Sequence, residues 1–423
     1  MIFPRWAAAG LLFAVSLLCA SDWPQWRGPL RTGHVPDGFA VPSKLPEDPK
    51  IVWRMKVGEG LASPVVAGGK VFYFDNTTGK ETLHALEAAD ARELWKKEID
   101  EPFCDMQGPS GPRCTPLVDG DRVYALSCKG ELQCLSVADG KMIWRVNFTN
   151  DFGGMFIGEK GNAPGASRHG NNGSPLINGD FLYACVGGTN GAGVVCFEKR
   201  TGKVLWKSQN DQAAFAAPII ATIAGVRQLI CFTCDGLIGL DPREGKLLWR
   251  VPLKTAFARH VTTPVVYGDI VVVGSHQVGL VGVKVSRAGA GFKADQAWLS
   301  KESAMNFSSP VAVGKYLYGL GPAKNIICVD IETGKQLWSK DGIISTSADK
   351  AHAAFLVMRD KILILTDSGQ LVLIAADPAE CKEISRAQVC AMNWSNPACA
   401  DGKLYLRDGI KNTGELLCVE LLH

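Results

Sequence analysis

The stretch Cys328–Lys340 reads CVDIETGKQLWSK, and the stretch Cys196–Ser208 reads CFEKRTGKVLWKS. In both, a tryptophan follows the cysteine after ten residues, and a Thr-Gly-Lys triplet lies between the two. Glycine supplies the positive φ that a tight turn between strands often needs. A strand–turn–strand unit that returns at a fixed spacing indicates an internal repeat, which has to be identified before other features are interpreted.

The same unit recurs along most of the chain. A small residue also lies ten positions before a tryptophan in the pairs Ala85 and Trp95, Cys134 and Trp144, and Gly239 and Trp249. Two copies depart from this spacing. In one, Gly282 and Trp298 are sixteen residues apart, and in the other Ile384 occupies the tryptophan position.

A second landmark lies upstream of each turn, where a small or polar residue and a proline precede a β-rich run. The prolines are Pro64, Pro116, Pro175, Pro218, Pro264, Pro310 and Pro397, and a degenerate copy without proline starts at His352. These copies contain several short Val/Ile/Leu/Tyr runs separated by Gly and Asp turns, a pattern typical of a small antiparallel sheet. A four-stranded repeat of about 40–50 residues is one blade of a β-propeller. The sequence therefore predicts an all-β, eight-bladed propeller over residues 51–423.

The two ends of the repeat region predict how the ring closes. The eighth copy ends in LLCVELLH, without a turn or a tryptophan, whereas the first repeat-like element, IVWRM with Trp53, has no copy before it. We expect residues 51–56 to supply the missing outer strand of the last blade. A closed ring leaves no exposed sheet end that could pair with another chain.

The first residues resemble an export signal. Arg5 precedes an apolar run and then small residues, so residues 1–21 are predicted to be a signal peptide and residues 22–50 an N-terminal arm. We expect the protein to be periplasmic or extracellular, without a membrane span in the mature chain. Cys19 raises the alternative of a lipoprotein, but Leu18 is large for the residue before a lipidated cysteine.

Charge and cysteine usage exclude some functions. The formal net charge is +3 and no basic cluster is present, so a nucleic-acid partner is not expected, and we expect a monomer. The seven histidines lack zinc-type spacing. Cysteines share one repeat position with Ala and Gly and are expected to be small buried residues, namely Cys134, Cys196, Cys328 and Cys418. Cys104 with Cys114, or less favourably Cys381 with Cys390, could form a disulfide. Cys231 and Cys234 lie on a predicted strand, where a redox role is not expected.

The repeat also resembles a known family. Cys328, Asp330, Thr333, Gly334, Lys335 and Trp338 match the tryptophan-docking motif of quinoprotein (PQQ-type) propellers, with Cys where that family usually has Ala. The opening DWPQWRGP, residues 22–29, is similar to the start of exported PQQ-like propellers. The resemblance implies that each indole packs between blades, against a small residue of the neighbouring blade and a peptide plane near the turn glycine. We refer to seven residues as the docking tryptophans: Trp53, Trp95, Trp144, Trp206, Trp249, Trp298 and Trp338.

The family resemblance implies two functions. One kind of member is the PQQ-dependent alcohol dehydrogenase, and the other is BamB, a non-enzymatic scaffold of outer-membrane assembly. The enzymes hold PQQ with Ca²⁺ and often carry two adjacent cysteines. This chain has no Cys-Cys dipeptide, and no three oxygen-bearing residues match the Ca²⁺ site. We therefore predict an exported binding or protein-assembly module, and keep as the alternative a PQQ-dependent oxidoreductase acting on an alcohol or sugar. No motif supports a hydrolase or lyase.

The candidate site lies in the loops that precede the inner strands, because these loops should meet at one mouth of the central channel. They carry Arg113, Arg168, His169, Asn171, Asn172, Phe215, Arg259, His260, Asn306, Phe307, His352, Asn393 and Trp394. The longest insertion, residues 147–173, should feed the same mouth. We expect a cationic funnel that binds a protein or peptide partner or PQQ; the alternative is a merely solvated funnel. We also expect replacement of Arg113 and Arg259 to leave stability almost unchanged, because loop residues are usually exposed.

Overall fold

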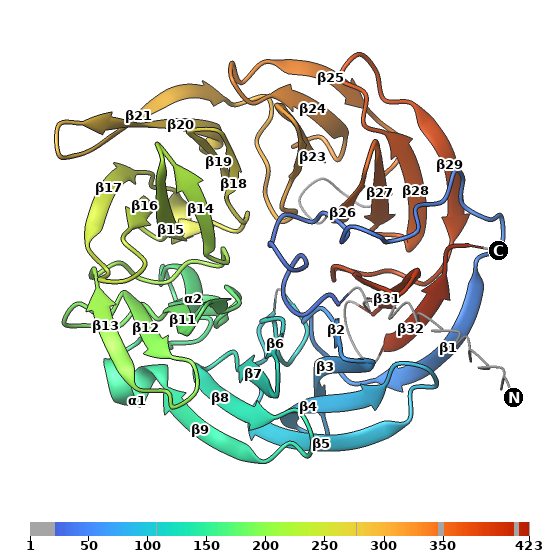
Figure 1. Cartoon of the computed structure of the whole chain (residues 1–423), viewed down its shortest axis with the longest axis horizontal. Helices are drawn as coiled ribbons and strands as arrows, with labels where there is room; N and C mark the ends of the chain where they lie inside the picture. The colour runs from blue at the N-terminus through green and yellow to red at the C-terminus, as the bar shows by residue number, and fades with distance from the viewer. Residues whose placement is uncertain (1–21, 107, 276, 346–350, 410–413, 423) are drawn as a thin grey trace, which may run out of the picture.

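The protein is described from a computed structural model that covers residues 22–106, 108–275, 277–345, 351–409 and 414–422. These residues form eight four-stranded antiparallel sheets arranged around a common axis (Figure 1). The prediction of an eight-bladed β-propeller is confirmed. The predicted signal peptide and Cys19 lie outside the described residues. Within the described ranges, no helix has the length and apolar character needed to cross a membrane.

The strands run from the axis outward within each blade. Blade one consists of β2 (Val65–Ala67), β3 (Lys70–Thr77), β4 (Lys80–Glu87) and β5 (Glu93–Asp100), and blade two of β6 (Leu117–Asp119), β7 (Arg122–Leu126), β8 (Glu131–Ser136) and β9 (Met142–Asn147). Blade three consists of β10 (Leu176–Asn178), β11 (Phe181–Cys185), β12 (Val194–Glu198) and β13 (Val204–Ser208), and blade four of β14 (Ile219–Ile223), β15 (Val226–Thr233), β16 (Gly236–Leu240) and β17 (Leu247–Pro252).

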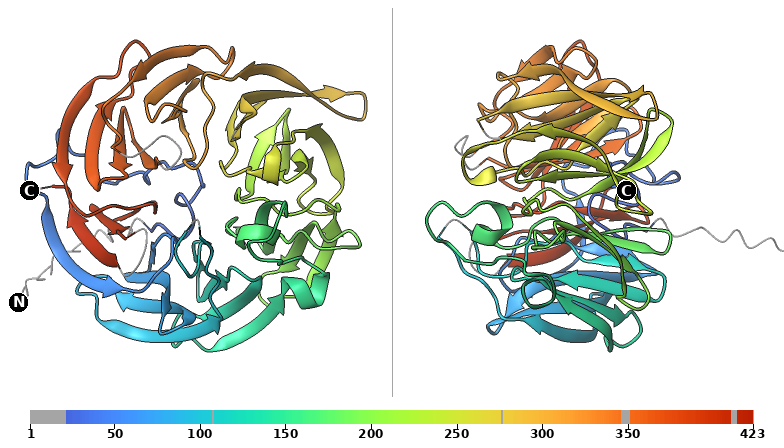
Figure 2. Two further views of the ribbon diagram at one scale, coloured as in Figure 1. Left: turned by 180° about the vertical axis from the view of Figure 1, so that it is seen from behind. Right: turned by 90° about the vertical axis from the view of Figure 1, so that its left-hand side faces the viewer.

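The second half of the ring repeats this order. Blade five consists of β18 (Val265–Tyr267), β19 (Ile270–Ser275), β20 (Gly279–Ala288) and β21 (Gly291–Ser300), and blade six of β22 (Val311–Val313), β23 (Tyr316–Leu320), β24 (Ile326–Asp330) and β25 (Gln336–Lys340). Blade seven consists of β26 (Ala353–Met358), β27 (Lys361–Thr366), β28 (Gln370–Ala375) and β29 (Glu383–Gln388), and blade eight of β30 (Ala398–Ala400), β31 (Lys403–Arg407), β32 (Gly414–Glu420) and β1 (Lys50–Val57). Among the residues that the structure describes, three short helices lie in loops, α1 (Phe148–Phe152), α2 (Gly165–His169) and the 3₁₀ helix η1 (Ala256–Ala258). In the side view of Figure 2, the segment with α2 stands out from one face of the ring.

The ring closes as the sequence predicted. Strand β1 pairs antiparallel with β32, with Lys50 opposite Glu420 and Trp53 opposite Cys418. The two ends of the chain thus share one blade, and in Figure 1 the blue β1 lies outside the red β32. The predicted closing segment, residues 51–56, lies within this strand.

Each docking tryptophan faces a small residue on the neighbouring strand of its own blade. The pairs are Ala85 with Trp95, Cys134 with Trp144, Cys196 with Trp206, Gly239 with Trp249, Gly282 with Trp298, Cys328 with Trp338, and Cys418 with Trp53. A Cβ atom on Gly239 would come within 2.3 Å of the Trp249 indole, so the residue opposite the indole must be small. The family resemblance implied a small residue of the neighbouring blade, but the strand register places it within the same blade.

The indoles also connect neighbouring blades. Six of the seven donate a hydrogen bond to a backbone carbonyl oxygen of the next blade, at N···O distances from 2.8 to 3.3 Å; the acceptors are Ala88, Val137, Lys199, Pro242, Ile331 and Asp377. At four of these boundaries a turn glycine of the next blade lies against the ring: Gly140 on Trp95, Gly202 on Trp144, Gly245 on Trp206 and Gly334 on Trp298. A Cβ atom on Gly140 would be 2.6 Å from Trp95, and φ of Gly140 is +69°. Both the close approach and the positive φ explain why the turn carries Gly.

Trp249 is the exception, and the cause lies in the next blade. There, β20 and β21 form a hairpin of two ten-residue strands, so the short docking turn of the other blades is missing. Trp249 instead donates to the side-chain oxygen of Gln228, 2.6 Å away in its own blade. Its ring packs into the apolar cluster between blades four and five.

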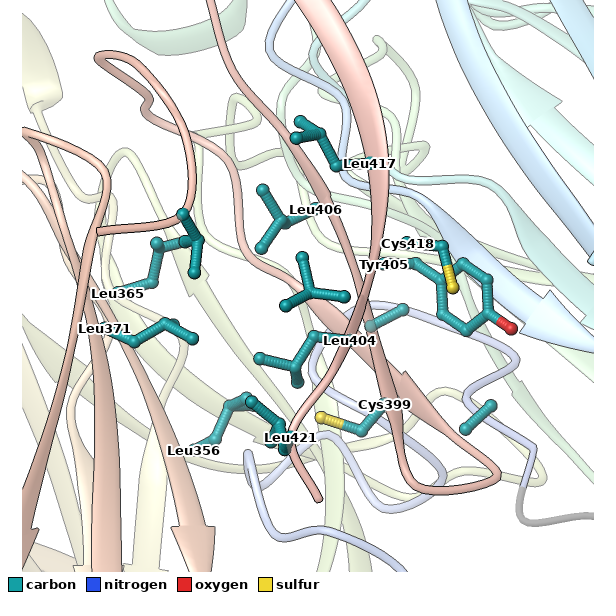
Figure 3. Close-up of a cluster of buried hydrophobic side chains, with 14 of the residues drawn as sticks. Leu356, Leu365, Leu371, Cys399, Leu404, Tyr405, Leu406, Leu417, Cys418 and Leu421 are labelled. Atoms are coloured by element: carbon teal, nitrogen blue, oxygen red, sulfur yellow. The ribbon is translucent and has the colours of Figure 1, made fainter. Parts of the chain in front are cut away.

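The core consists of apolar layers between adjacent blades. The largest cluster spans blades seven, eight and one, and the part between blades seven and eight contains Leu371, Leu404 and Leu421, all of which are buried (Figure 3). Cys399 and Cys418 belong to the same cluster and are fully buried, with Cys418 beside Tyr405 on the other side of blade eight. Burial of such side chains is the main favourable contribution to folding, at about 25 cal/mol per Å² of apolar surface.

The N-terminal arm runs from the axis to the rim between blades seven and eight (Figure 1). Near the axis it contacts seven of the eight blades. Trp23 pairs with Val66 of blade one, Pro24 accepts a hydrogen bond from Val118 of blade two, and Val35 donates to Val357 of blade seven. Contacts with blades three to six come from the side chains of Trp26, Arg27 and Arg31.

Two buried arginines hold the arm in place. Arg31 donates to the carbonyl oxygens of Ser174, Pro175 and Pro218, the last at 2.8 Å, and Arg27 donates to that of Pro310. Burial lowers the pKa of Arg31 to about 9 and that of Arg27 to about 10, so both remain charged at neutral pH. Their acceptors are carbonyls at the start of the inner strands.

The structure contains no disulfide among the described cysteines. Cys104 is exposed and Cys114 is buried, and the suggested pairs Cys104–Cys114 and Cys381–Cys390 are not formed. Cys231 lies in β15 and Cys234 directly after it, as expected. Burial raises the pKa of Cys234, which opposes thiolate chemistry there.

We predict that a variant beginning at Gly58 will be insoluble or melt at a much lower temperature than the full chain. It lacks β1, which leaves the edge of β32 unpaired and removes Trp53. A variant beginning at Lys50 is the control, because it lacks only the arm. Thermal unfolding compares the two variants, which both lack the arm; equal melting of the Gly58 and Lys50 variants would contradict the closure model.

We predict that Cys328→Ala is nearly neutral, because Ala85 occupies the equivalent position in blade one. Cys328→Leu should lower the free energy of unfolding by about 1–3 kcal/mol, because the side chain opposite Trp338 is fully buried and has no room to grow. Denaturant unfolding of both variants measures the difference, and equal stabilities would show that this layer is loosely packed.

Candidate functional site

A cavity of about 1130 Å³ lies at the mouth of the ring formed by the loops that precede the inner strands. Nine of the thirteen predicted site residues line it: Arg113, His169, Asn172, Phe215, Arg259, Asn306, Phe307, His352 and Trp394. With Leu61, each of the eight blades contributes at least one residue. The repeat thus brings residues from distant parts of the sequence to a single site.

Hydrogen bonds between neighbouring loops fix the mouth of the cavity. The residue before the inner-strand proline usually has a hydroxyl, and the backbone N–H of an adjacent blade donates to it. Thr115 N–H bonds to Ser174 at 2.8 Å, Thr263 to Ser309 at 2.9 Å, and Asn396 to Ser63 at 2.9 Å. We call these contacts the hydroxyl ring. They hold the loops at a fixed separation around the axis.

Four predicted residues do not line the cavity. Arg168 lies over the ring of Phe257 at 4.7 Å, and Asn171 donates to the carbonyl of Cys128 at 3.1 Å. His260 is fully buried, stacked on Phe232 and hydrogen-bonded to Thr233. Asn393 is fully buried and donates to Thr366. The contacts of these four residues connect and stabilise loops.

A buried ion-pair cluster occupies one wall. Asp105 lies 2.7 Å from a guanidinium nitrogen of Arg113 and 2.9 Å from Nδ1 of His169, and it accepts a hydrogen bond from the backbone of Gly108. Burial alone would raise the pKa of Asp105, but the hydrogen bond from His169 and the charge of Arg113 hold it well below its usual range. The cluster joins the loop before β6 to the end of α2.

The opposite wall is aromatic. Phe307 and Trp394 stack with ring centres 5.5 Å apart, and His352 lies 6.3 Å from Trp394. His352 is buried, and burial lowers its pKa to about 4, so it is neutral at pH 7. Three polar atoms of this wall have no hydrogen-bond partner among the described residues: Asn306 Oδ1, His352 Nδ1 and Trp394 Nε1.

The prediction of a cationic funnel is wrong, because most of the basic residues predicted for it add no uncompensated positive charge to the cavity. Asp105 compensates the charge of Arg113, and burial lowers the pKa of His260 and of His352. Arg259 remains at the cavity, near the Phe257 ring. Arg113 is also not an exposed loop residue, because only 7% of its side chain is accessible, so its replacement will not leave stability unchanged.

Several residues that line the cavity were not predicted from the sequence. Trp26 reaches the cavity from the arm and donates to Thr263 at 2.9 Å. Asp105, Met106 and Met392 also line the cavity, and they lie in the same loops as predicted site residues. Trp26 belongs to the DWPQWRGP opening, which indicated a family resemblance and not a place in the cavity.

The lining does not fit Ca²⁺ with PQQ. Ca²⁺ requires several oxygen ligands, usually with carboxylates among them. Asp105 is the one carboxylate that lines the described cavity, and Arg113, His169 and Gly108 already engage it. No group of three His, Cys, Asp or Glu residues suited to a metal occurs among the described residues.

The fold and the docking tryptophans define the class of this protein as an eight-bladed PQQ-like propeller. A family model described as outer membrane protein assembly factor BamB matches residues 45–151 and 105–340, and the chain belongs to this family. Among curated relatives, BamB of Shewanella oneidensis is 22% identical over 88% of this chain and 89% of its own length. BamB of Yersinia pestis is 25% identical over 54% of this chain, and the match spans about half (52%) of that relative's length.

Solved structures share the fold. BamB from Moraxella catarrhalis superimposes with a TM-score of 0.57 at 15% identity, over 88% of this chain and 98% of that chain. A quinohemoprotein alcohol dehydrogenase from Pseudomonas putida HK5 gives 0.51 at 13% identity, over 95% and 80%. At these identities the likeness concerns the fold alone, so the function has to be inferred from the site.

We predict that Arg113→Ala will lower the free energy of unfolding by about 3–5 kcal/mol, because it removes the guanidinium from its buried ion pair with Asp105. The control is Asp360→Asn, whose side chain is 82% exposed and which should change stability by about 0.5 kcal/mol or less. Denaturant unfolding at pH 7 measures both, and a neutral Arg113→Ala would contradict a structural role.

The pH dependence gives a separate prediction. The folded-state pKa of Asp105 is depressed, so its stabilisation is present above the unfolded pKa of about 3.9 and is lost as the pH falls through the folded pKa. Asp105→Asn should therefore be less stable than the wild type at pH 7, and the difference should shrink below about pH 4. Unfolding measured from pH 3 to pH 7 checks this, and a constant difference would exclude an ionised Asp105.

Proposed function

We propose that this chain is an exported, monomeric scaffold for the assembly of outer-membrane proteins, and that it holds a polypeptide partner in the cavity. The relatives named above are described as outer membrane protein assembly factors, which supports this class of function. The signal-like N-terminal sequence supports export to the periplasm.

The observation that carries the proposal is the composition of the cavity. The cavity is large, and the charges of Arg113 and Asp105 on one wall compensate each other. Much of the remaining lining is apolar and includes Leu61, Phe215, Val261 and Met392. Methionine side chains adapt to different apolar partners. Such a lining suits a polypeptide segment better than a polyanionic cofactor, so the quinoprotein alternative is not favoured.

Removal of this protein from its host should lower the amount of folded outer-membrane β-barrel proteins, measured by their heat-dependent mobility on gels. Met392→Asp should restore them poorly, because it puts a charge at the cavity, where Met392 is 50% exposed. Met142→Asp is the matched control, since Met142 is 49% exposed on outer strand β9. Equal rescue by both variants would argue against the cavity, and unchanged β-barrel levels on removal would argue against the assembly role.

A further inference from the structure

The aromatic wall of the cavity has unused hydrogen-bonding capacity. We call Asn306, Phe307, His352 and Trp394 the aromatic subsite. They come from the loops before β22, β26 and β30, the inner strands of three consecutive blades. The rings of Phe307 and His352 lie 5.5 Å and 6.3 Å from that of Trp394, measured between ring centres, and Asn306 precedes Phe307 in the same loop and lines the same cavity.

Polar atoms buried without partners are rare in folded proteins, and each costs free energy unless something bonds to it. Here three such atoms lie in one subsite. His352 lines the cavity, and only 4% of the residue is exposed. Its Nδ1 atom has no hydrogen-bond partner among the described residues. Trp394 Nε1 can only donate, and Asn306 Oδ1 can only accept.

The chemistry of the subsite restricts its ligand. A neutral imidazole presents one donor and one acceptor, so the subsite as a whole offers both kinds of group. No charged side chain belongs to it, and an anion would face the carbonyl oxygen of Asn306. The complementary ligand is neutral, carries both a donor and an acceptor, and has a flat apolar face that can pack against Phe307 and Trp394.

We propose that the aromatic subsite binds an aromatic side chain of an extended polypeptide, with the adjoining peptide group bonding to His352, Trp394 or Asn306. A peptide group has one N–H and one C=O, which matches the unpartnered atoms. The cavity of about 1130 Å³ exceeds the volume of one side chain, and its apolar remainder accommodates neighbouring residues. This inference rests on the proposed function and names the feature that the site selects.

Binding of labelled peptides to the purified protein, followed by fluorescence anisotropy, tests the selection. The probes are neutral, capped nine-residue peptides that alternate threonine with phenylalanine and tyrosine, or threonine with leucine. The aromatic peptide should bind about tenfold more tightly than the leucine peptide. Trp394→Ala and Phe307→Ala should each abolish most of this preference.

The control variant is Phe292→Ala, which removes a ring from β21, outside the cavity lining. It should bind both peptides as the wild type does. Circular dichroism and melting curves identify any variant that fails to fold, and in that case Asn306→Asp provides the test, because a carboxylate beside the ligand should weaken binding of both peptides.

The outcomes separate the two proposals. If both peptides bind equally and Trp394→Ala has no effect, the aromatic subsite is overturned while the cavity remains a polypeptide site. If neither peptide binds, both proposals fail. If a neutral glucose oligosaccharide competes with the aromatic peptide at a lower concentration than unlabelled peptide does, the subsite binds sugar and the inference is overturned.

Discussion

The fold depends on one repeated contact, the indole of one blade lying on the outer turn of the next, with a turn glycine against the ring at four of the boundaries. The indole N–H donates to a carbonyl oxygen at the start of that turn, as Trp95 does to Val137, which precedes Gly140. The same indole requires a small residue opposite it on its own sheet, as Ala85 or Gly239 shows. Each tryptophan therefore links three positions: its own, the small residue opposite it in the same blade, and the turn of the neighbouring blade. These links explain the fixed spacing in the sequence.

Where the contact between indole and turn is missing, other residues connect the neighbouring elements. Blade five has a long hairpin instead of the docking turn, and Trp249 has turned to Gln228 within its own blade. In the seventh blade the sequence suggested that Ile384 takes the tryptophan position, but the strand register places Ser385 there, opposite Leu373. The arm packs at this point, with Leu45 N–H bonded to Ser385. Both departures were visible as irregular spacing, but the compensating partners were not.

The sequence was sufficient for the fold because a repeat provides many copies of the same evidence. Eight weak signals with one spacing predicted the blades, and the mismatch between the chain ends predicted the pairing of β1 with β32. The site was harder to predict. Residues such as Phe307 and Trp394 lie in the loops that the topology brings together, and their positions followed from the repeat. The burial of Arg113 against Asp105 did not, because a loop residue can fold back on a neighbour through contacts that have no period.

The arm alters how the blades depend on one another. In an ordinary repeat protein each unit contacts only its neighbours, so stability is close to a sum of local terms and units can be lost one at a time. Here Arg31 bonds to blades three and four, Arg27 to blade six, and Trp23 to blade one. Blades that never touch thus share one segment of chain. The propeller should consequently behave as a single cooperative unit, in which melting of any one blade releases the arm from all the others.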